Sequence, residues 1–280
     1  MSRAWSVLRR RPLALIGLAV VIVHVALALL APAIVPFDPL KLVDAPLEPP
    51  GGPYALGTDE LGRDFLSRLL MGGRVSIVVA FAAGAIAAVG GGLIGLTAAC
   101  RRGAFDDVVS RLVETKLAIP SILFVALFVT GFGQSTGVLI AVVATIKMMG
   151  VIRTARAQGL VLMQHGYVRA AQLRGESSAS IVLRELLPNV ADLLAVEFAL
   201  RASSALLLVS SLSFLGLGIS PPTPDWGLMI HDGLSSIRSE PWLILAPALC
   251  IATLVVGINF ATDGVSDALG LEAARGVAGH

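Results

Sequence analysis

The stretch LALIGLAVVIVHVALALLAPAIV, residues 13–35, decides the fold of this chain. It holds one polar side chain, His24, and no charged one. A helix crosses the hydrocarbon layer of a bilayer with about 20 such residues, so the stretch predicts a transmembrane helix. The arginines at positions 9–11 precede it as they would precede a secretory signal, but no small-residue cleavage site follows before Pro36. We therefore expect a retained membrane anchor.

The rest of the chain continues this pattern. Hydrophobic residues make up 56% and charged residues 14% of the sequence, whereas soluble domains are roughly 25% charged. This composition excludes a water-soluble globular protein, and the frequent small residues suit helices packed closely in lipid. Five further apolar runs predict spans at residues 75–99, 117–132, 136–152, 190–217 and 243–261. The predicted fold is an all-α membrane protein with six transmembrane helices, divided into an N-terminal segment 1–12, a transmembrane domain 13–270 and a tail 271–280.

Lys and Arg are distributed unequally about these spans. An even number of spans places both termini on one side, together with the 2–3 and 4–5 links. That side holds most of the basic residues, whereas the other side holds Lys41, Arg63, Arg68, Arg74 and Arg238. Basic residues concentrate in cytoplasmic flanks, so we expect both termini and the 4–5 link in the cytoplasm. A five-span chain would move that link or the tail outside and weaken the asymmetry.

The two outward segments, residues 36–74 and 219–241, are rich in Pro and Gly. Apolar side chains that share one side predict a short surface helix near residues 61–71. Trp226 and Trp242 flank the outer ends of the fifth and sixth spans, where we expect them in an interfacial aromatic belt.

Charged residues near the outer turn and within the spans suggest ion pairs. Asp59, Arg63 and Asp64 are expected to pair among themselves and fix the outer turn. A charge within a span costs about 2.5–3.5 kcal/mol on insertion scales. Lys147 is near enough to the cytoplasmic end of its span to extend there. Arg201 follows Glu197 by four residues, so either an ion pair within the helix lowers its cost or the guanidinium faces a passage.

The 4–5 link is too long for a simple connection and too polar for a span. It contains the sequence YVRAAQLRG, residues 167–175, which favours a helix that stops at Gly175. Residues 177–187 can form a second helix, which we expect Pro188 to break. The link therefore predicts a helix–turn–helix that projects into the cytoplasm.

Motifs for enzymatic chemistry do not occur. The chain has no phosphate-binding glycine-rich loop, and its four histidines lack metal-ligand spacing. A membrane-embedded enzyme would need facing polar groups within the spans, and Lys147, Glu197, Arg201 and His24 form no recognisable set. A self-sufficient secondary transporter would need inverted halves and midplane carboxylates, which the spans do not offer.

The 4–5 link resembles the cytoplasmic "EAA" loop of ATP-binding-cassette (ABC) importer permeases. That pattern has Glu-Ala-Ala, a Gly four residues after the second Ala, and a later Leu-Pro. Arg169 stands where the pattern has Glu, which puts in doubt any salt bridge assigned to that Glu. In the family this loop seats a coupling helix in a groove of the ATPase subunit, so the resemblance implies ATPase coupling through Tyr167, Arg169, Ala170, Ala171, Gly175, Leu187 and Pro188.

Three other stretches resemble the dipeptide/oligopeptide/nickel permeases, specifically the second, C-type subunit. They are GTDELGRD at 57–64 with GRVS at 73–76, LSFLGLG at 212–218 with PPTPDWG at 221–227, and the closing segment 259–269. Ser266 stands in the last where a basic residue is common. The matches span residues 12–270.

This resemblance implies half of a translocation passage in the bacterial cytoplasmic membrane, completed by a homologous B-type permease subunit. Two separate ABC ATPase subunits would hold ATP and Mg, so this chain is expected to bind no cofactor, no metal and no nucleic acid. A periplasmic or lipid-anchored binding protein would deliver the solute. Small peptides are the most frequent cargo of the family, and nickel chelates, glutathione and opine-like or sugar-like solutes are the alternatives.

Two further groups of residues are candidates for function. An outer gate or a contact with the binding protein is expected at Asp59, Arg63, Asp64, Pro222, Asp225 and Trp226. Residues expected to line the passage are Glu197, Arg201 and Ser204.

Overall fold

The computed structural model describes residues 11–268 as helices joined by loops. Most of the predicted segment 1–12 and the whole tail 271–280 lie outside this range. The elements are α2 (Pro12–Ile34), α3 (Phe65–Arg101), α4 (Gly103–Ala118), α5 (Ser121–Phe132), α6 (Thr136–Leu162), α7 (Gly166–Leu173), α8 (Ser178–Ser180), the π-helix η1 (Ile181–Leu186), α9 (Leu187–Phe214), α10 (Trp226–Asp232) and α11 (Trp242–Ala268).

The predicted all-α class is confirmed, and five helical stretches are long and apolar enough to cross a membrane. They are α2, α3, α6, the continuous helix 178–214 and α11. A sixth exists only if α4 and α5, which are bent by 94° relative to each other, count as one broken span. The span predicted at about 117–132 is therefore wrong as one continuous helix, because α4 ends at Ala118 and α5 begins at Ser121. Ile119 precedes Pro120 and is extended (φ −88°, ψ 124°), because a residue before proline is disfavoured in the α conformation.

The surface helix predicted near residues 61–71 is also wrong, since Phe65 begins the 37-residue helix α3. The Asp64 carboxylate caps this helix by accepting a 2.8 Å hydrogen bond from the backbone N–H of Ser67. Gly72 and Gly73 leave the helix intact. A Cβ on Gly73 would lie 2.5 Å from the Trp226 indole, so this glycine makes room for a neighbouring element.

The helix break predicted at Pro188 does not occur. Helix runs from Ser178 to Phe214, and the residues before the proline form the π-helical turn η1. There the N–H of Leu187 donates to the carbonyl of Val182, five residues back. This wider turn keeps the proline ring, which has no N–H to donate, at the second position of α9 without ending the helix.

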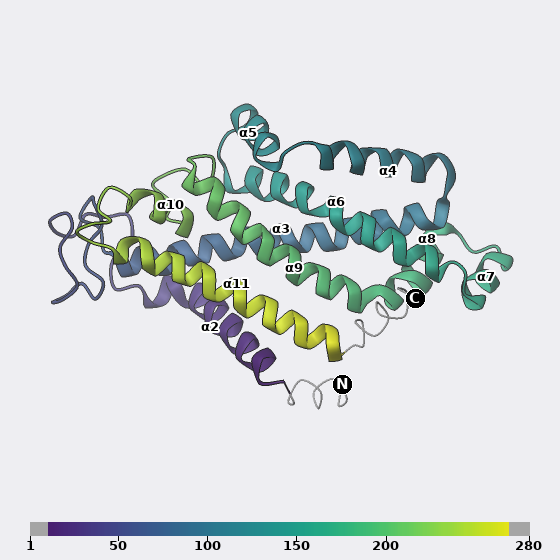
Figure 1. Cartoon of the computed structure of the whole chain (residues 1–280), viewed down its shortest axis with the longest axis horizontal. Helices are drawn as coiled ribbons and strands as arrows, with labels where there is room; N and C mark the ends of the chain where they lie inside the picture. Colours follow the sequence, from purple (N-terminus) through teal and green to yellow (C-terminus); the bar gives the residue numbers. More distant parts are fainter. Residues whose placement is uncertain (1–10, 269–280) are drawn as a thin grey trace.

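Helix α3 lies at the centre of the bundle, packed against α6, α9 and α2 (Figure 1). Glycines bring α3 and α6 close together. A Cβ on Gly95 would lie 2.5 Å from the Ile152 carbonyl oxygen, and one on Gly91 would lie 2.8 Å from Val151. Helices in lipid associate mainly through such van der Waals contact between small residues. On the other side of α3, α2 and α11 lie side by side (Figure 1).

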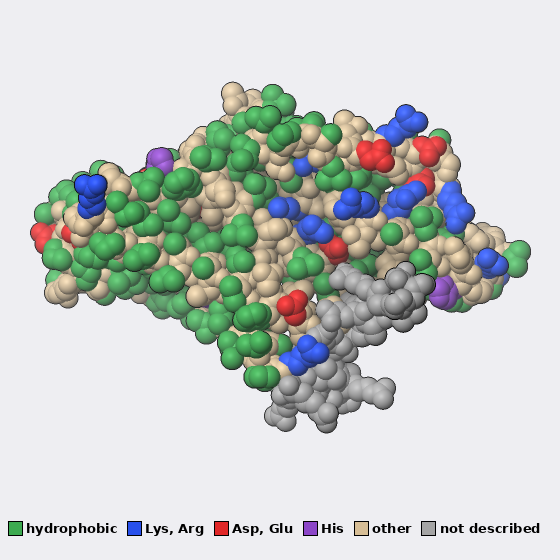
Figure 2. All heavy atoms as spheres, in the orientation of Figure 1, with side chains coloured by type: hydrophobic (Ala, Val, Ile, Leu, Met, Phe, Trp, Pro, Cys, Tyr) green, Lys and Arg blue, Asp and Glu red, His purple; other side chains and the backbone are tan. Residues whose placement is uncertain are grey.

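The two ends of the bundle differ in character. One end carries the loop 35–64 and α10, and the other carries α7 (Figure 1). The start of α2 and the end of α11 lie together, with Arg11 and Pro12 lining the same hollow as Asp263 and Gly264. Lys and Arg side chains gather toward the α7 end (Figure 2). The cytoplasmic location of that end stays a prediction.

The contact between α3 and α6 gives a first test. Replacing Gly95 with Leu forces a side chain into the Ile152 backbone, and overpacking of this kind costs about 1–3 kcal/mol or more. We expect Gly95→Leu to lower the thermal denaturation midpoint of the purified protein in detergent. The matched control is Gly131→Leu in α5, where a Cβ meets nothing within 4 Å. Equal midpoints for the two variants would contradict the proposed packing.

Candidate functional site

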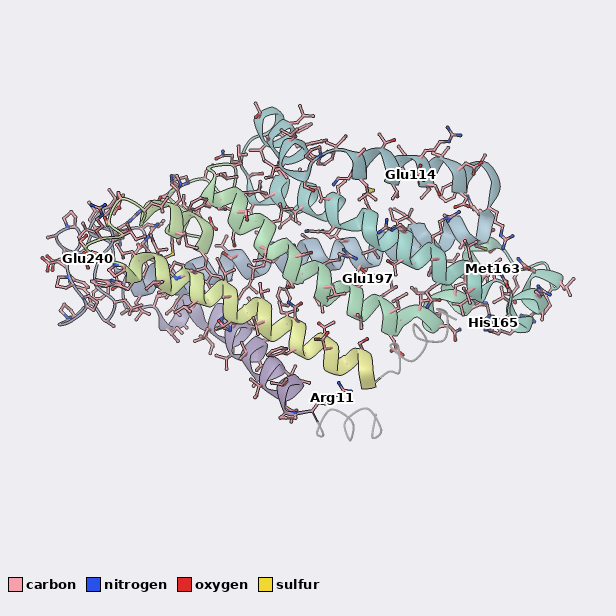
Figure 3. The ribbon with its side chains drawn as sticks, viewed as in Figure 1. Arg11, Glu114, Met163, His165, Glu197 and Glu240 are labelled. Atoms are coloured by element: carbon pink, nitrogen blue, oxygen red, sulfur yellow. The ribbon has the colours of Figure 1, made fainter. Side chains whose placement is uncertain are left out.

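Helix α7 projects from one end of the bundle and is anchored by one side. Val168 and Ala171 are fully buried in an apolar cluster that also includes side chains of α3, α6, η1 and α9. Met163 belongs to the same cluster, and His165 follows it at the base of α7 (Figure 3). The second alanine of the predicted Ala-Ala pair therefore faces the core. A larger side chain there would have to displace packed neighbours.

The turn predicted at Gly175 is confirmed. Gly175 has a φ of +77°, a conformation that glycine adopts without steric cost. The N–H of Gly175 donates to the carbonyl of Gln172, and the N–H of Glu176 donates to that of Ala171, at 3.0 and 3.2 Å. This pair of bonds is a Schellman motif, which ends α7 abruptly. The Arg174–Glu176 ion pair (2.6 Å) closes the turn and lowers the pKa of the Glu176 carboxyl.

The opposite side of α7 is exposed. Tyr167, Arg169 and Ala170 all lie on it. Leu173, whose residue surface is 89% exposed, lies there as well. The sequence analysis did not single out Leu173, although its position four residues after Arg169 places both on one helical face. Leu173 is thus an exposed apolar side chain on a helix whose other side is buried.

Leu187 and Pro188 lie apart from this tip. Both belong to the first turn of α9, where Leu187 packs against the buried cluster and Pro188 is exposed. They therefore support the helix on which α7 rests, rather than lining its exposed side.

At the other end, Asp59 organises the outer turn. Its carboxylate accepts from the backbone N–H groups of Leu61 and Arg63, both at 2.9 Å. It also accepts from Nε of Arg63 at 2.7 Å and forms an ion pair with Arg68, whose Nε lies 3.0 Å away. The predicted Asp59–Arg63 pair is confirmed, whereas Asp64 caps α3 and makes no ion pair in the described part of the chain.

Sequence analysis missed the structural role of Arg68. This side chain is only 2% exposed, and its Nη1 donates to the Pro39 carbonyl at 3.2 Å. A buried arginine is costly unless it is paired and hydrogen-bonded, and here it is both. Its position one turn into an apolar stretch, four residues after the helix cap, was the available signal.

A cavity of about 240 Å³ opens between the outer turn and α10. It is lined by both partners of the Asp59–Arg63 pair, and by Glu60, Arg68 and Asp232. Glu60 accepts hydrogen bonds from Ser235 and Ser236, which fixes the turn after α10 to the outer turn. Asp232 is half-buried, and its burial raises the pKa of the carboxyl.

Asp225 and Trp226 are buried, at 0% and 3% exposure. The aromatic belt predicted for Trp226 is therefore wrong, since its indole N–H donates to the Leu69 carbonyl (3.0 Å) in the interior. In this structure neither residue offers a surface to a binding protein. Pro222 is exposed and follows Pro221 through a cis peptide bond.

Asp225 caps α10 through one carboxylate oxygen, which accepts from the Gly227 N–H at 2.9 Å. Its other oxygen, Oδ2, is buried with no hydrogen-bond partner in the described part of the chain. Burial in this position raises the pKa of Asp225 to about 6.

The predicted passage residues share one face of α9. Nε and Nη2 of Arg201 donate to one carboxylate oxygen of Glu197, at 2.8 and 2.6 Å, so the predicted pair is confirmed. Glu197 lies near the middle of the helix (Figure 3). Ser204 is half-buried, and its hydroxyl donates to the Arg201 carbonyl at 3.2 Å.

Comparison with known proteins identifies the family to which this chain is similar. Residues 91–270 match the family described as "Binding-protein-dependent transport system inner membrane component", and residues 1–50 match the "N-terminal TM domain of oligopeptide transport permease C". The chain belongs to this family of permeases. It is a multi-pass membrane protein of that family, and the helix α7 lies within the matched region.

Several named relatives cover nearly the whole permease. It is 35% identical to the di/tripeptide transport system permease protein DppC of Pseudomonas aeruginosa over 96% of this chain and 91% of that protein. It is 36% identical to the oligopeptide transport system permease protein OppC of Escherichia coli, over 95% of this chain and 90% of that protein. The dipeptide transport system permease protein DppC of Bacillus subtilis is 33% identical over 95% of this chain and 84% of that protein.

The buried carboxyl of Asp225 gives a second test. Its pKa is raised from 3.8 to about 6 in the folded permease, so its stabilising contribution is present below about pH 4 and lost as the pH rises through 6. The cost at pH 8 is about 3 kcal/mol. We expect Asp225→Asn, which keeps an oxygen for the helix cap, to raise the thermal midpoint at pH 8.

This gain should shrink below pH 6 and vanish near pH 4. Thermal denaturation of the permease in detergent from pH 4 to 8 measures it, with the exposed Asp44→Asn as the matched control. A gain that does not depend on pH would contradict the assignment of the raised pKa to Asp225.

Proposed function

We propose that this chain is the C-type permease subunit of an ABC importer for small peptides. The family assignment and relatives that are named for dipeptide, di/tripeptide and oligopeptide transport support this function. In the bacterial cytoplasmic membrane, the chain and a homologous B-type subunit each form half of the passage. A periplasmic or lipid-anchored binding protein delivers the peptide to the outer end, which carries α10.

The energy comes from two separate ABC ATPase subunits, which hold ATP and Mg. This chain holds neither and catalyses no covalent step. Its role is that of a two-state element whose inward-open and outward-open forms are biased by the nucleotide state of its partners. The termini and α7 lie on the cytoplasmic side.

The observation that carries the coupling role is the two-sided character of α7. Its outer side presents Tyr167, Arg169 and the 89% exposed Leu173, whereas its inner side is locked by Val168 and Ala171. A side chain docked on the outer side therefore pushes on the whole cluster, because the helix cannot roll on its base without opening packed apolar contacts. The Gly175 turn keeps α7 at a fixed angle to the helix that begins at Ser178.

The other predicted sites fit the same cycle. Asp59, Arg63 and Arg68 hold the outer turn together through ion pairs, and they line a cavity shared with the segment 221–243. The two segments are joined by the hydrogen bonds of Ser235 and Ser236 to Glu60 and of the Trp242 indole to the Leu56 carbonyl. Opening of the outer gate separates these two segments, with Asp64, Pro222, Asp225 and Trp226 at their edges. Glu197, Arg201 and Ser204 face the passage from α9.

The coupling role predicts a specific defect. Leu173→Asp places a charge at the centre of the ATPase contact, and loss of one well-buried interface residue costs about 2 kcal/mol or more. We expect the ATPase subunits to bind the solubilised permease at least about tenfold more weakly, as measured by co-purification at limiting concentration. Uptake driven by ATP should fall in parallel.

The control is Leu234→Asp, an exposed leucine just after α10 at the opposite end. It should leave ATPase binding unchanged. The coupling role of α7 is wrong if Leu173→Asp retains full ATPase binding and full uptake.

The cargo is tested with the reconstituted importer. We expect proteoliposomes that contain both permease subunits, the ATPases and the binding protein to accumulate labelled di- and tripeptides only when ATP is supplied. ATP-dependent accumulation of a nickel chelate, glutathione or an opine in place of peptides would contradict the peptide assignment and leave the importer assignment standing. Accumulation by this chain alone, without ATP, would overturn both.

A further inference from the structure

Three cations from three different helices gather in the middle of the molecule. They are Lys116 in the last turn of α4, Lys147 midway along α6 and Arg201 on α9. Lys147 lies within electrostatic reach of both Arg201 and Lys116. Figure 2 shows Lys and Arg side chains over the middle of α6 and its borders with α4 and α9. We call these three residues the basic cluster.

The Arg201 side chain lies against a glycine of α6 in this cluster. Its guanidinium lies across the backbone of α6 at Gly150, where a Cβ would stand only 3.1 Å from Nη1. A Cβ at position 150 would therefore crowd the guanidinium. Gly150 lies three residues after Lys147, so the Lys147 side chain and the head of Arg201 share one face of α6.

The basic cluster has too little negative charge of its own. Glu197 pairs with Arg201 at 2.6 Å, but Lys147 makes no ion pair or hydrogen bond among residues 11–268. The Lys116 ammonium lies 5.4 Å from the centre of the Phe124 ring and has no carboxylate partner in the same range. Three positive charges thus share a single carboxylate.

An excess of positive charge is unfavourable in contact with lipid, because each charge costs about 2.5–3.5 kcal/mol at the bilayer centre. This excess of positive charge is tolerated where water or a bound anion is present. Arg201 is suited to bind such an anion. Its two hydrogen bonds to Glu197 are donated by Nε and Nη2, so Nη1 donates no hydrogen bond in the described residues. The Glu197 side chain is 7% exposed and that of Arg201 is 27% exposed, so the open edge of the pair is the cation.

We propose that the basic cluster is a carboxylate-binding station inside the passage, in which Lys147 and Arg201 bind the anionic end of the cargo as it passes. This inference rests on the proposed function, and it identifies the chemical group of the cargo that the passage binds. For a peptide, that feature is the C-terminal carboxylate. Charge-assisted hydrogen bonds from a guanidinium and an ammonium to one carboxylate are strong and directional. Glu197 holds Arg201 in position between cargo molecules.

The test uses the complete importer in vesicles of phosphatidylcholine alone, so that no anionic headgroup is present. Uptake of one tripeptide with a free C-terminus is compared with uptake of its C-terminal amide, each at a concentration that saturates the binding protein. We expect Lys147→Gln to lower uptake of the free acid at least about tenfold and to leave uptake of the amide unchanged. Lys147→Arg should restore the preference for the acid.

The matched control is Arg153→Gln, which removes an exposed cation from the same helix outside the basic cluster. It should change neither uptake rate. Co-purification of the partner subunits with the Lys147 variant distinguishes loss of carboxylate binding from loss of the assembled importer.

A second measurement does not depend on the cargo. In a chain whose two cysteines are replaced by serine, Ser204→Cys places a thiol one turn from Arg201. We expect it to react faster with a negatively charged methanethiosulfonate than with a positively charged one, and Lys147→Gln to remove this preference. Equal rates with both reagents in the presence of Lys147 would overturn the station.

The remaining outcomes are also decisive. Equal loss of acid and amide uptake in Lys147→Gln, or no loss of either, overturns the carboxylate station while peptide import itself stands. Loss of uptake only in vesicles that contain anionic lipid would assign Lys147 to a lipid headgroup and overturn the station as well. Absence of any ATP-dependent peptide uptake in the unmodified importer would instead refute the proposed function.

Discussion

The close approach of α3 and α6 is the constraint on which the rest of this permease depends. Apolar side chains gain little by leaving lipid for a helix interface, so helices in a membrane associate where small residues let their backbones touch. Gly91 and Gly95 do this toward α6, and Gly84 does it toward α9, where a Cβ would lie 2.9 Å from the Ala202 nitrogen. Helices α6 and α9 are thus held against one central helix. The polar side chains that these two helices carry consequently meet along a shared border.

Helix α3 also joins the two ends of the bundle. It begins at the Asp64 cap, beside the Asp59 ion pairs of the outer turn, and it ends near the cluster beneath α7, to which it contributes Leu96. Its 37 residues form a helix considerably longer than the bilayer requires. At its outer end, the buried charges of Asp59 and Arg68 are paired. The Asp59 carboxylate accepts four hydrogen bonds or ion pairs, and Arg68 adds the Pro39 carbonyl.

The sequence predicts well what depends on length and local pairing. The apolar runs predicted α2 and α11, the glycine at 175 predicted the turn after α7, and the four-residue spacing predicted the Glu197–Arg201 pair. Features that depend on distant neighbours were not predicted. Trp226 is buried because Gly73, far away in the sequence, leaves space for its indole. The register of α3 likewise follows from a cap at Asp64, within a loop whose own fold is set by contacts across the outer end.

Pro120 and Pro188 show the same limit, because the local sequence does not predict whether a proline ends its helix. Pro120 ends a helix and Pro188 does not, although the local rule is the same for both. The difference lies in the residues before them. Ile119 can turn outward into an extended conformation, whereas Ile181, Val182 and Leu186 are buried against the α7 base and keep the chain helical. The chain resolves the conflict by widening one turn into η1, at the cost of ordinary helical hydrogen bonds.

That widened turn has a mechanical consequence for the proposed importer. Helix 178–214 begins beside α7, the proposed coupling helix, and carries Glu197 and Arg201 farther along the same continuous element. Between the two sites, this element departs from regular α-helical geometry at η1. Ile181, Val182 and Leu186 of η1 are packed into the cluster that also holds Val168 and Ala171, so η1 is fixed to α7 by apolar contacts. In the proposed importer, a displacement of α7 by the ATPases would therefore move α9, and with it the Arg201 guanidinium that lies against Gly150 of α6.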